Sequence, residues 1–258
     1  MYGPIKEWYR GYHRRKTIKK FEDICDEVRL NMFVEDSIKI YQDKIEERFT
    51  VELNRNIEGT QIMHPIPFEQ TLDAVNSKFT IDKYLSDQAF NFSKEGNVEE
   101  FFYGKHPFLP VEKLYVGFAS SKNYGYLIEK NKDIYTKRTY IWTPDFNLRT
   151  VFPIKIAEKL HSVIPLQIVQ PKHIYKYDEG KDKPISCYVG LSENFNVGNI
   201  MEVMNNILKI FNTDEKIILD ANKRMKKYKD NECYWLGLTN KYGVYFATLY
   251  YSRTFKQN

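Results

Sequence analysis

Runs rich in β-branched and aromatic residues, broken by polar turns, dominate the hydrophobic pattern of this chain. Runs of this composition and length are typical of β-strands. The expected strands cover residues 34–41, 47–54, 113–120, 124–129, 134–142, 166–177, 185–192 and a closing hairpin that ends with 244–255. The polar run Lys130-Asn131-Lys132-Asp133 has the composition of a hairpin turn. The pattern predicts a protein built largely from strands.

Apolar residues at helical spacing separate some of these strands. Helices are expected over residues 15–30, 68–76 and 153–163, and a pair of helices is expected before the closing hairpin. The first of that pair has an apolar face of Ile200, Val203, Met204, Ile207, Leu208 and Phe211, and the second has one of Ile217, Ile218, Ala221, Met225 and Tyr228. Thr213, followed by two acidic residues, is the expected N-cap of the second helix. Residues 79–111 are mixed and have no assignment.

The last third therefore has the element order β, α, α, β, β. An α-α-β-β unit that repeats with antiparallel strands can close a barrel whose outside is covered by helices. Tyr, Arg and Lys on the other strand faces would then point into the barrel. We expect an α+β fold, an antiparallel β-barrel ringed by helices, formed by a single domain over residues 1–258.

Three of the expected strands share an aromatic residue two positions before a glycine. The segments are Tyr115-Val116-Gly117-Phe118-Ala119, Tyr188-Val189-Gly190-Leu191-Ser192 and Trp235-Leu236-Gly237-Leu238-Thr239. A glycine inside a strand usually marks a bulge, a bend or a close approach. The repeat indicates curved strands with aromatic walls, or convergent hairpin sequence in an ordinary α+β protein.

Composition limits the function classes only weakly. Aromatic residues make up 16% of the 258 residues, a share that suits an aromatic-lined pocket but also reflects AT-rich codon usage. The net charge of +5 is compatible with nucleic acid, an acidic surface or a phosphorylated substrate. The three cysteines have neither metal-ligand spacing nor the even count of a disulfide framework. With no signal-like or transmembrane apolar run, the expected location is the cytoplasm.

Common catalytic motifs are missing. The chain has no Walker-type loop, no dinucleotide glycine fingerprint and no GxSxG elbow. Its five histidines are scattered, and none pairs with a cysteine or carboxylate at metal-ligand spacing. Nucleotide-dependent and serine-hydrolase chemistry therefore receive no support.

Short segments spread over most of the chain carry a family resemblance. They are Tyr234-Trp235-Leu236-Gly237, Leu249-Tyr250-Tyr251-Ser252-Arg253-Thr254-Phe255, Tyr188-Val189-Gly190-Leu191-Ser192, Phe90-Asn91-Phe92-Ser93-Lys94, Phe21-Glu22-Asp23, Glu35, and Asp43-Lys44 with Arg48-Phe49. In order and spacing they resemble the ABBA-type aromatic prenyltransferases, nearest the cyanobactin (ribosomal peptide) prenyltransferases. That family has a barrel of antiparallel strands surrounded by α-α-β-β repeats, which agrees with the element order above.

The resemblance implies transfer of an isoprenyl group from an allylic diphosphate, by default dimethylallyl diphosphate, onto a peptide side chain or an aromatic acceptor, as in RiPP biosynthesis. The chemistry needs cations for the departing diphosphate, aromatic faces for the allylic cation and a carboxylate for the acceptor. Mg²⁺ would aid by neutralising the diphosphate.

Site residues follow from the same resemblance. Glu35 matches the acceptor-side glutamate, and Arg48 matches a diphosphate-binding arginine; the alternatives are a surface glutamate and an arginine paired with Glu46 or Glu47. In the strand 134–142, Lys137 lies on one face, and the other face carries Arg138, Tyr140 and Trp142. We assign the Arg138/Tyr140 face to the barrel interior, although a one-residue register shift would reverse this. The expected diphosphate-binding residues are Arg48, Arg138 and Lys137, and the expected aromatic cage is Tyr140, Trp235, Tyr250 and Tyr188; these aromatics could also be core.

Two departures from the family pattern affect these expectations. The chain is short between Ser121 and Lys172, where a helix pair or a strand pair is lost. The alternatives that follow are an open barrel, a different isoprenoid or the absence of the activity. After Ser192, the segment Asn194-Phe195-Asn196-Val197-Gly198-Asn199 stands where relatives carry a tyrosine-rich strand. The alternative function is a non-catalytic protein that binds nucleic acid or peptide on a basic, aromatic-lined sheet.

Overall fold

A computed structural model describes residues 15–24, 31–54, 67–96, 98, 100–105, 111–118, 123–165, 169–191, 197–228 and 232–254. The strands are β1 (Asn31–Ile40), β2 (Ile45–Asn54), β3 (Glu100–Lys105), β4 (Val111–Phe118), β5 (Tyr124–Asn131), β6 (Ile134–Thr143), β7 (Val169–Asp178), β8 (Ser186–Leu191), β9 (Glu232–Lys241) and β10 (Val244–Thr254). They follow the hydrogen-bonded order β1-β10-β9-β8-β7-β6-β5-β4-β3-β2 and close as a barrel. The strand pairs with a described register are antiparallel. The expected α+β antiparallel barrel is confirmed, in its closed form.

Helices precede only some of the strand pairs. Residues 15–24 are helical, and the longer elements are α2 (Phe68–Phe79), α3 (Lys83–Ser93), α4 (Ile154–Val163), α5 (Val197–Ile210) and α6 (Glu215–Met225). The α-α-β-β order is complete in α2-α3-β3-β4 and in α5-α6-β9-β10. Among the described residues, no helix lies between β4 and β5, which begins six residues after β4 ends, and α4 with a short 3-10 turn (Leu148–Thr150) precedes β7. The helix pairs described in the structure thus precede β3 and β9.

Contacts within the chain separate two compact units. One consists of residues 1–34, 50–137 and 254–258, and the other of residues 35–49 and 138–253. We call them the first and second unit. The expectation of a single domain over residues 1–258 stays a prediction.

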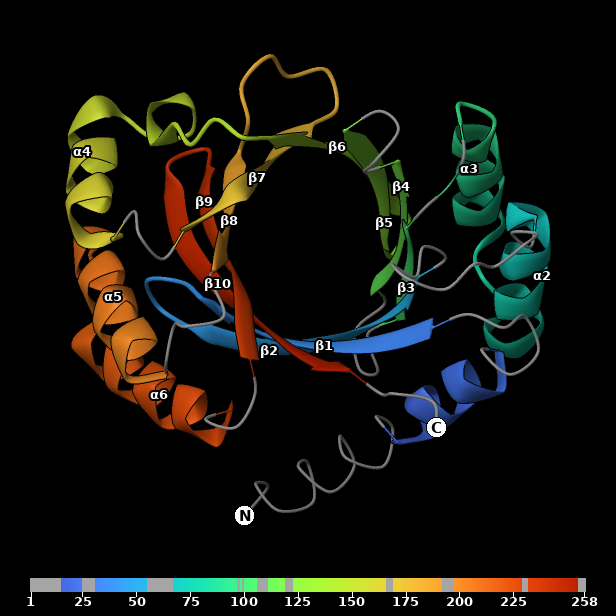
Figure 1. Cartoon of the computed structure of the whole chain (residues 1–258), viewed down its shortest axis with the longest axis horizontal. Coiled ribbons are helices and arrows are strands. Elements are labelled where there is room, and N and C mark those ends of the chain that lie inside the picture. The colour runs from blue at the N-terminus through green and yellow to red at the C-terminus, as the bar shows by residue number, and fades with distance from the viewer. Residues whose placement is uncertain are drawn as a thin grey trace. The chain divides into compact units, whose positions relative to one another are not determined.

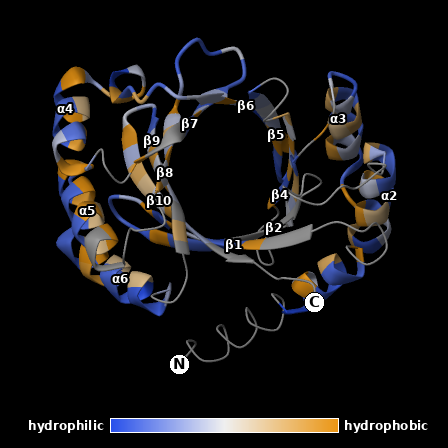
Figure 2. Ribbon diagram, viewed as in Figure 1, coloured by the Kyte–Doolittle hydropathy of each residue, from blue (hydrophilic) through white to orange (hydrophobic). Residues whose placement is uncertain are grey.

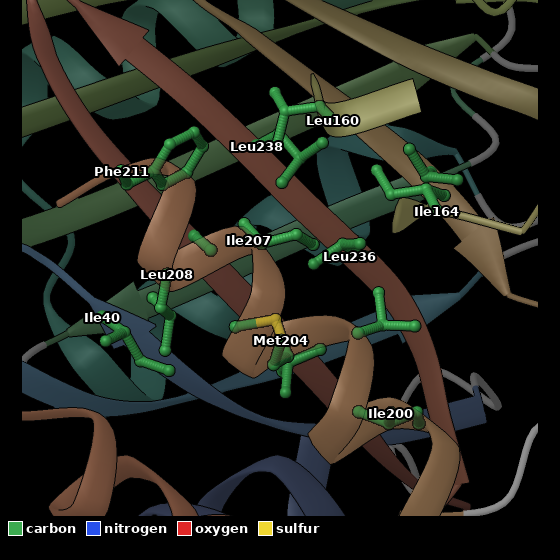
Figure 3. Close-up of a cluster of buried hydrophobic side chains, with 14 of the residues drawn as sticks. Ile40, Leu160, Ile164, Ile200, Met204, Ile207, Leu208, Phe211, Leu236 and Leu238 are labelled. Atoms are coloured by element: carbon green, nitrogen blue, oxygen red, sulfur yellow. The ribbon is translucent and has the colours of Figure 1, made fainter. Parts of the chain in front are cut away.

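In the second unit, α4, α5 and α6 cover one face of β7–β10 (Figure 1). Alternate strand residues such as Cys187, Val189, Leu236 and Leu238 lie on this face and are buried. Figure 3 shows Leu236 and Leu238 beside the apolar face of α5, whose Ile200, Met204, Ile207, Leu208 and Phe211 belong to the same cluster. In Figure 2 these helices carry apolar and polar positions side by side, as amphipathic helices do. The helix-covered side of the sheet is therefore the hydrophobic core of this unit.

The predicted cap of α6 is wrong by one residue. Asp214, not Thr213, is the N-cap, and its carboxylate accepts a hydrogen bond from the Lys216 amide at 2.8 Å. The Thr213 amide donates instead to the Leu208 carbonyl at 2.9 Å, after Asn212 turns with φ of 55°. Thr213 is thus part of the turn that ends α5, and the next residue starts α6.

The first unit has its own core under α2 and α3. The rings of Phe21, Phe79 and Tyr103 contact one another, with centroids 4.6 to 6.3 Å apart. The Tyr103 hydroxyl donates to the Glu112 carboxylate at 2.8 Å. The unassigned stretch 79–111 contains α3 and β3; α3 buries only Leu85 and Ala89, which explains its weak periodicity.

One buried histidine links α4 to the sheet of the second unit. His173 of β7 is 2% exposed, its Nδ1 has no partner among the described residues, and its ring lies 5.0 Å from that of Phe146. The ring of Phe146 also lies 5.1 Å from that of His161 of α4. Burial lowers the pKa of His173; burial and the nearby Arg149 lower that of His161. Both imidazoles are neutral in the fold at neutral pH.

Acid is therefore expected to destabilise the fold through His173. The unfolded chain binds protons below the ordinary histidine pKa of about 6.5, and the folded chain binds them only at lower pH. The stability that the neutral imidazole contributes is complete above about pH 6.5 and is lost as pH falls, by at most about 1.4 kcal/mol per pH unit. Urea unfolding at pH 7.5 and 5.5 should show that the free energy of unfolding falls less with pH in His173→Leu than in the native chain. His161→Gln is the control and should keep the loss of unfolding free energy that His173 causes. Equal dependence of unfolding free energy on pH in the native chain and in His173→Leu would show that His173 does not cause the loss.

Among the described residues, no helix has the length and apolar content needed to cross a bilayer.

Candidate active site

The face of β6–β10 that is turned away from α4–α6 carries most of the predicted site residues, and we call it the inner face. In the antiparallel register, Tyr140 lies opposite Lys176, Tyr188 lies opposite Gly237, and Trp235 lies opposite Tyr250. Successive strand residues point to opposite faces, so these side chains share the face that the helices leave open. All of them belong to the second unit.

Three tyrosine rings meet on this face. The ring centroids of Tyr140 and Tyr188 are 5.9 Å apart, and those of Tyr188 and Tyr250 are 5.8 Å apart. Gly237 lies under them: a Cβ there would come within 3.1 Å of the Tyr188 ring and 3.3 Å of the Tyr250 ring. Gly237 therefore leaves the space that allows these aromatic rings to lie close to the strand. The bulges lie elsewhere, between Tyr250 and Tyr251 and between Val169 and His173.

A lysine that the sequence reading did not select joins the tyrosines. Lys176 Nζ lies 5.5 Å from the centre of the Tyr188 ring. Burial raises the pKa of Tyr188, but the Lys176 charge and hydrogen bonds with Lys176, Tyr250 and Tyr140 outweigh it, so the pKa is lowered. Burial, with the negative charges of Tyr188 and Glu35, raises the pKa of Tyr250 well above its ordinary value. The two hydroxyls thus have opposite tendencies to ionise.

Glu35 of β1 and Arg48 of β2 both interact electrostatically with Tyr250. Glu35 is half-buried and interacts electrostatically with Tyr250. Burial lowers the pKa of Arg48, but Glu46, Tyr41 and Tyr250 raise it, and the net pKa is raised, so the guanidinium stays charged. The structure therefore brings Glu35, Arg48 and Tyr250 into one electrostatic group within the second unit.

Arg48 forms an ion pair with Glu46, one of the alternatives that the sequence left open. Lys44 also pairs with Glu46, at 2.9 Å. Burial raises the pKa of Glu46, but Lys44 and Arg48 outweigh it and lower the pKa to about 2. The carboxylate is ionised over the whole physiological range and holds both cations in place.

Lys39 enlarges this cationic group. Its Nζ lies 3.9 Å from the Phe246 ring centre and 4.7 Å from the Tyr41 ring centre, and the two rings are 4.8 Å apart. Lys39, Lys44 and Arg48 bring three positive charges to this part of the site, where Glu46 and Glu35 are carboxylates. Cations over aromatic rings beside the tyrosines are suited to an anionic ligand that has an apolar part.

The other predicted cations are placed differently. Arg138 lies on the inner face but donates to the Asp178 carboxylate at 3.0 Å, and Asp178 also accepts from the Tyr242 hydroxyl at 3.2 Å. Lys137 lies on the opposite face of β6, with its Nζ 5.6 Å from the Phe92 ring of α3. The structure thus supports the choice of face in β6, and we leave Lys137 out of the proposed site.

The first unit has an inner cluster of its own on β3, β4 and β5. The rings of Phe102 and Tyr115 are 4.6 Å apart, and the Tyr115 hydroxyl donates to Glu100 at 3.5 Å. Gly117 and Gly125 leave room for that hydroxyl, since a Cβ on either would lie within 2.8 Å of it. The first aromatic–glycine repeat therefore serves the same purpose as the third, for a different ring.

The sequence alone did not indicate that Lys176 belongs to the candidate site, nor which rings Gly237 contacts. Lys176 faces Tyr140 only through the β6–β7 register, and α4 separates these strands in sequence. No hairpin turn sets that register, so composition carries no signal for it. Residues 192–196 lie outside the described residues, and they include the first half of the segment 194–199 that departs from the family pattern. Cys25 also lies outside the described residues.

The described residues do not fit a metal ion held by the protein alone. They contain no group of three or more His, Cys, Asp or Glu side chains that could hold one. Two carboxylates of the site, Glu46 of β2 and Asp178 of β7, are each paired with a cation. A Mg²⁺ ion bound to substrate phosphates would need few protein ligands, but no step below is routed through it.

Gly237→Val tests the close approach of the rings. The valine side chain is expected to push against Tyr188 and Tyr250 and to lower the free energy of unfolding by about 1–3 kcal/mol, the usual cost of overpacking. Urea denaturation of Gly237→Val, Tyr188→Ala and the double variant measures the coupling. The double variant should lose less than the sum of the single losses, because the smaller side chain at 188 leaves room. Strictly additive losses would contradict the packing described.

Comparison with known protein families finds no match, and comparison with curated proteins finds none either. Among solved structures, the chain is similar to that described as "Crystal structure of AnaPT from Neosartorya fischeri". The similarity has a TM-score of 0.49 with 12% sequence identity, and it covers 84% of this chain and 77% of that one.

Proposed function

We propose that the chain is a cytoplasmic ABBA-type prenyltransferase. It moves an isoprenyl group, by default dimethylallyl, from its diphosphate onto a peptide side chain or an aromatic acceptor. The observation that supports this best is the grouping of Glu35, Arg48 and the tyrosines 140, 188 and 250 in one electrostatic and aromatic cluster. These residues come from five strands, β1, β2, β6, β8 and β10.

The cationic group would bind the diphosphate. When the carbon–oxygen bond of an allylic diphosphate breaks, negative charge grows on the leaving group, and fixed cations stabilise that change. Lys39, Lys44 and Arg48 supply the cations, and Glu46 orients two of them. The Arg138–Asp178 pair is neutral as it stands and contributes a weaker field.

The tyrosine rings would surround the allylic cation. Aromatic faces attract a cation through the ring quadrupole, by about 0.5–2 kcal/mol for each ring according to its desolvation. Tyr140, Tyr188 and Tyr250 are half-buried and adjacent, and Trp235 lies across from Tyr250 in the register. Such rings also keep water from the cation, which would otherwise give an alcohol.

Glu35 would orient the acceptor. A half-buried carboxylate beside Tyr250 can accept a hydrogen bond from an acceptor N–H or O–H and raise the electron density of the atom that attacks. The proposal leaves the choice between a peptide side chain and a small aromatic molecule to experiment.

The direct test is incubation of the full chain with dimethylallyl, geranyl and farnesyl diphosphates and a panel of tyrosine-, tryptophan- and serine-containing peptides, with and without Mg²⁺. Release of pyrophosphate that depends on both substrates, with a prenylated product in mass spectrometry, is the expected result. A prenyl diphosphate should also raise the melting temperature at low concentration. No turnover with any donor, together with nucleic-acid binding that weakens steeply with salt, would favour the binding-protein alternative.

A further inference from the structure

The exposed face of α6 carries a group of lysines. Lys216, Lys223, Lys226 and Lys227, in the helix and in the 3-10 turn (Lys226–Tyr228) that directly follows it, are all exposed. Residues seven apart in a helix lie on one side of it, since a turn takes about 3.6 residues. Lys216 and Lys223 have this spacing, and Lys227 follows Lys223 by four, the spacing of neighbours on a helix surface. The four lysines therefore share one surface, which we call the lysine face.

Positive charge is concentrated on this segment. Residues 215–228 contain five cations and two carboxylates, an excess of three, whereas the whole chain of 258 residues has a net charge of +5. Of the two carboxylates, Asp220 pairs with Arg224 at 2.9 Å, and Arg224 also pairs with Glu47 of β2 at 3.0 Å. Among the described residues, none of the four lysines forms an ion pair. The charge of the lysine face is thus left unmatched by the described part of the chain.

One apolar side chain stands within the lysine face. Leu219 is 57% exposed and lies between Lys216 and Lys223, three and four residues away from them. The opposite face of α6, with Ile218 and Ala221, is buried in the core of the second unit. An exposed leucine between lysines suits a partner that combines carboxylates with an apolar side chain.

Anionic partners differ in what else they need from a surface. Single-stranded nucleic acid stacks its bases on aromatic rings, but Tyr228, the aromatic residue of this segment, is already stacked on the buried Tyr251 ring, with centroids 4.7 Å apart. An anionic bilayer binds a helix that buries its apolar face in lipid, and the apolar face of α6 is already buried in the protein. An acidic helix needs only cations at helical spacing and an apolar contact, which the lysine face supplies.

We propose that the lysine face of α6 is a docking surface for an acidic helical segment of another polypeptide. Carboxylates of that segment pair with Lys216, Lys223 and Lys227, and an apolar residue of it covers Leu219. In the second unit, α6 lies on the helix-covered side of the sheet, opposite the inner face, so the partner can stay bound without blocking the candidate site. The inference goes beyond the proposed prenyl transfer and does not depend on it. Exposed ion pairs are individually weak, so the contact is transient and sensitive to salt.

Fluorescence anisotropy tests the docking surface without donor or acceptor. The probe is a fluorescein-labelled helical peptide that has glutamates seven residues apart and a leucine between them, and its control has lysine in place of each glutamate. The full chain should bind the acidic peptide and not the basic one. The affinity should fall by about tenfold or more between about 50 and about 300 mM salt, because screening weakens exposed charge pairs. No binding of the acidic peptide to the folded native chain overturns the proposal.

Charge-reversing variants locate the binding surface. The combined variant Lys216→Glu, Lys223→Glu and Lys227→Glu should bind the acidic peptide at least about tenfold more weakly, because each attraction becomes a repulsion. The matched control makes the same change in net charge on three exposed lysines elsewhere in the second unit, Lys155→Glu, Lys159→Glu and Lys183→Glu. It should change the affinity by about threefold or less. Equal losses in the two variants would mean attraction by net charge alone and overturn the proposal.

Milder variants keep the test valid if charge reversal disturbs α6. Glutamine at the same three positions removes the charges without reversing them and should also weaken binding, and Leu219→Ala should weaken it by about threefold or more through the lost apolar contact. Circular dichroism checks that each variant is folded. Unchanged binding in the folded glutamine variant overturns the proposal. Tighter binding to phosphatidylserine vesicles or to single-stranded RNA than to the acidic peptide, lost in the same variants, overturns the choice of a polypeptide partner.

Discussion

Arg48→Ala is expected to lower prenyl transfer by about 10²–10³-fold, the usual effect of removing one group that stabilises developing charge. Arg48 stays charged through its ion pair with Glu46 and lies in the same electrostatic group as Tyr250 and Glu35. Its side chain is 34% exposed, and its loss would remove the less exposed of the two cations paired with Glu46 in the proposed diphosphate site. Since the interaction grows as the carbon–oxygen bond breaks, the loss should appear mainly in kcat and only weakly in KM.

Lys44→Ala is the matched control for this prediction. Lys44 pairs with the same Glu46, but its side chain is 56% exposed and water screens its charge. We expect a change in activity of about threefold or less, measured as pyrophosphate release under the same conditions. Full activity in Arg48→Ala, or equal losses in both variants, would contradict the placement of the diphosphate beside Arg48.

Phe211→Ala is expected to lower the free energy of unfolding by about 3–5 kcal/mol, the cost typical of emptying an aromatic site in a core. Phe211 directly follows α5, is 0% exposed, and has ring neighbours Phe152 at 5.7 Å and Tyr245 at 5.5 Å. Figure 3 shows it at one edge of the cluster that joins α5 to the sheet. Phe152 precedes α4 and Tyr245 belongs to β10, so the Phe211 ring packs between a helix and the sheet. Removing it leaves a cavity that the neighbouring side chains can fill only in part.

Leu219→Ala provides the comparison. Leu219 is an apolar residue of α6, but its exposed fraction is 57%, so truncation should change stability by no more than about 0.5 kcal/mol. Urea denaturation monitored by tryptophan fluorescence measures both variants. Similar midpoints for Phe211→Ala and Leu219→Ala would show that the α5–sheet contact contributes little to the fold.

The elements with strong periodicity could be predicted because burial on one face leaves a mark in the sequence. The expected apolar face has six residues at helical spacing, and five of them lie in α5, which ends at Ile210. The helix α3 buries only two residues and was missed, since its start depends on the Asp82 cap and its packing on a distant strand. Thr213 and Asp214 are both good caps, and only the turn that ends α5 decides between them.

The sequence could indicate which residues of the candidate site share one face of one strand. Successive residues of a strand point to opposite faces, so Arg138 and Tyr140 share one face of β6 and Lys137 lies on the other. The sequence therefore left two possible sets of inward-facing residues to choose between. What the residues on that face contact was not predictable, because partners come from other strands. Asp178 neutralises Arg138, and Lys176 acts on Tyr188, through registers that no local turn specifies.

The ladder of strands closes between β1 and β10, which has a consequence for the order of folding. The strand that ends at Ile40 has as its neighbour the strand that begins at Val244, about 200 residues later. Contacts of such sequence separation slow folding, because the long loop between them loses entropy before the pairing stabilises it. On the ribosome, β1 must wait for the last strand to emerge, with an unpaired edge that invites aggregation. We therefore expect C-terminally truncated chains to aggregate during synthesis, whereas the full chain closes the ladder as its final step.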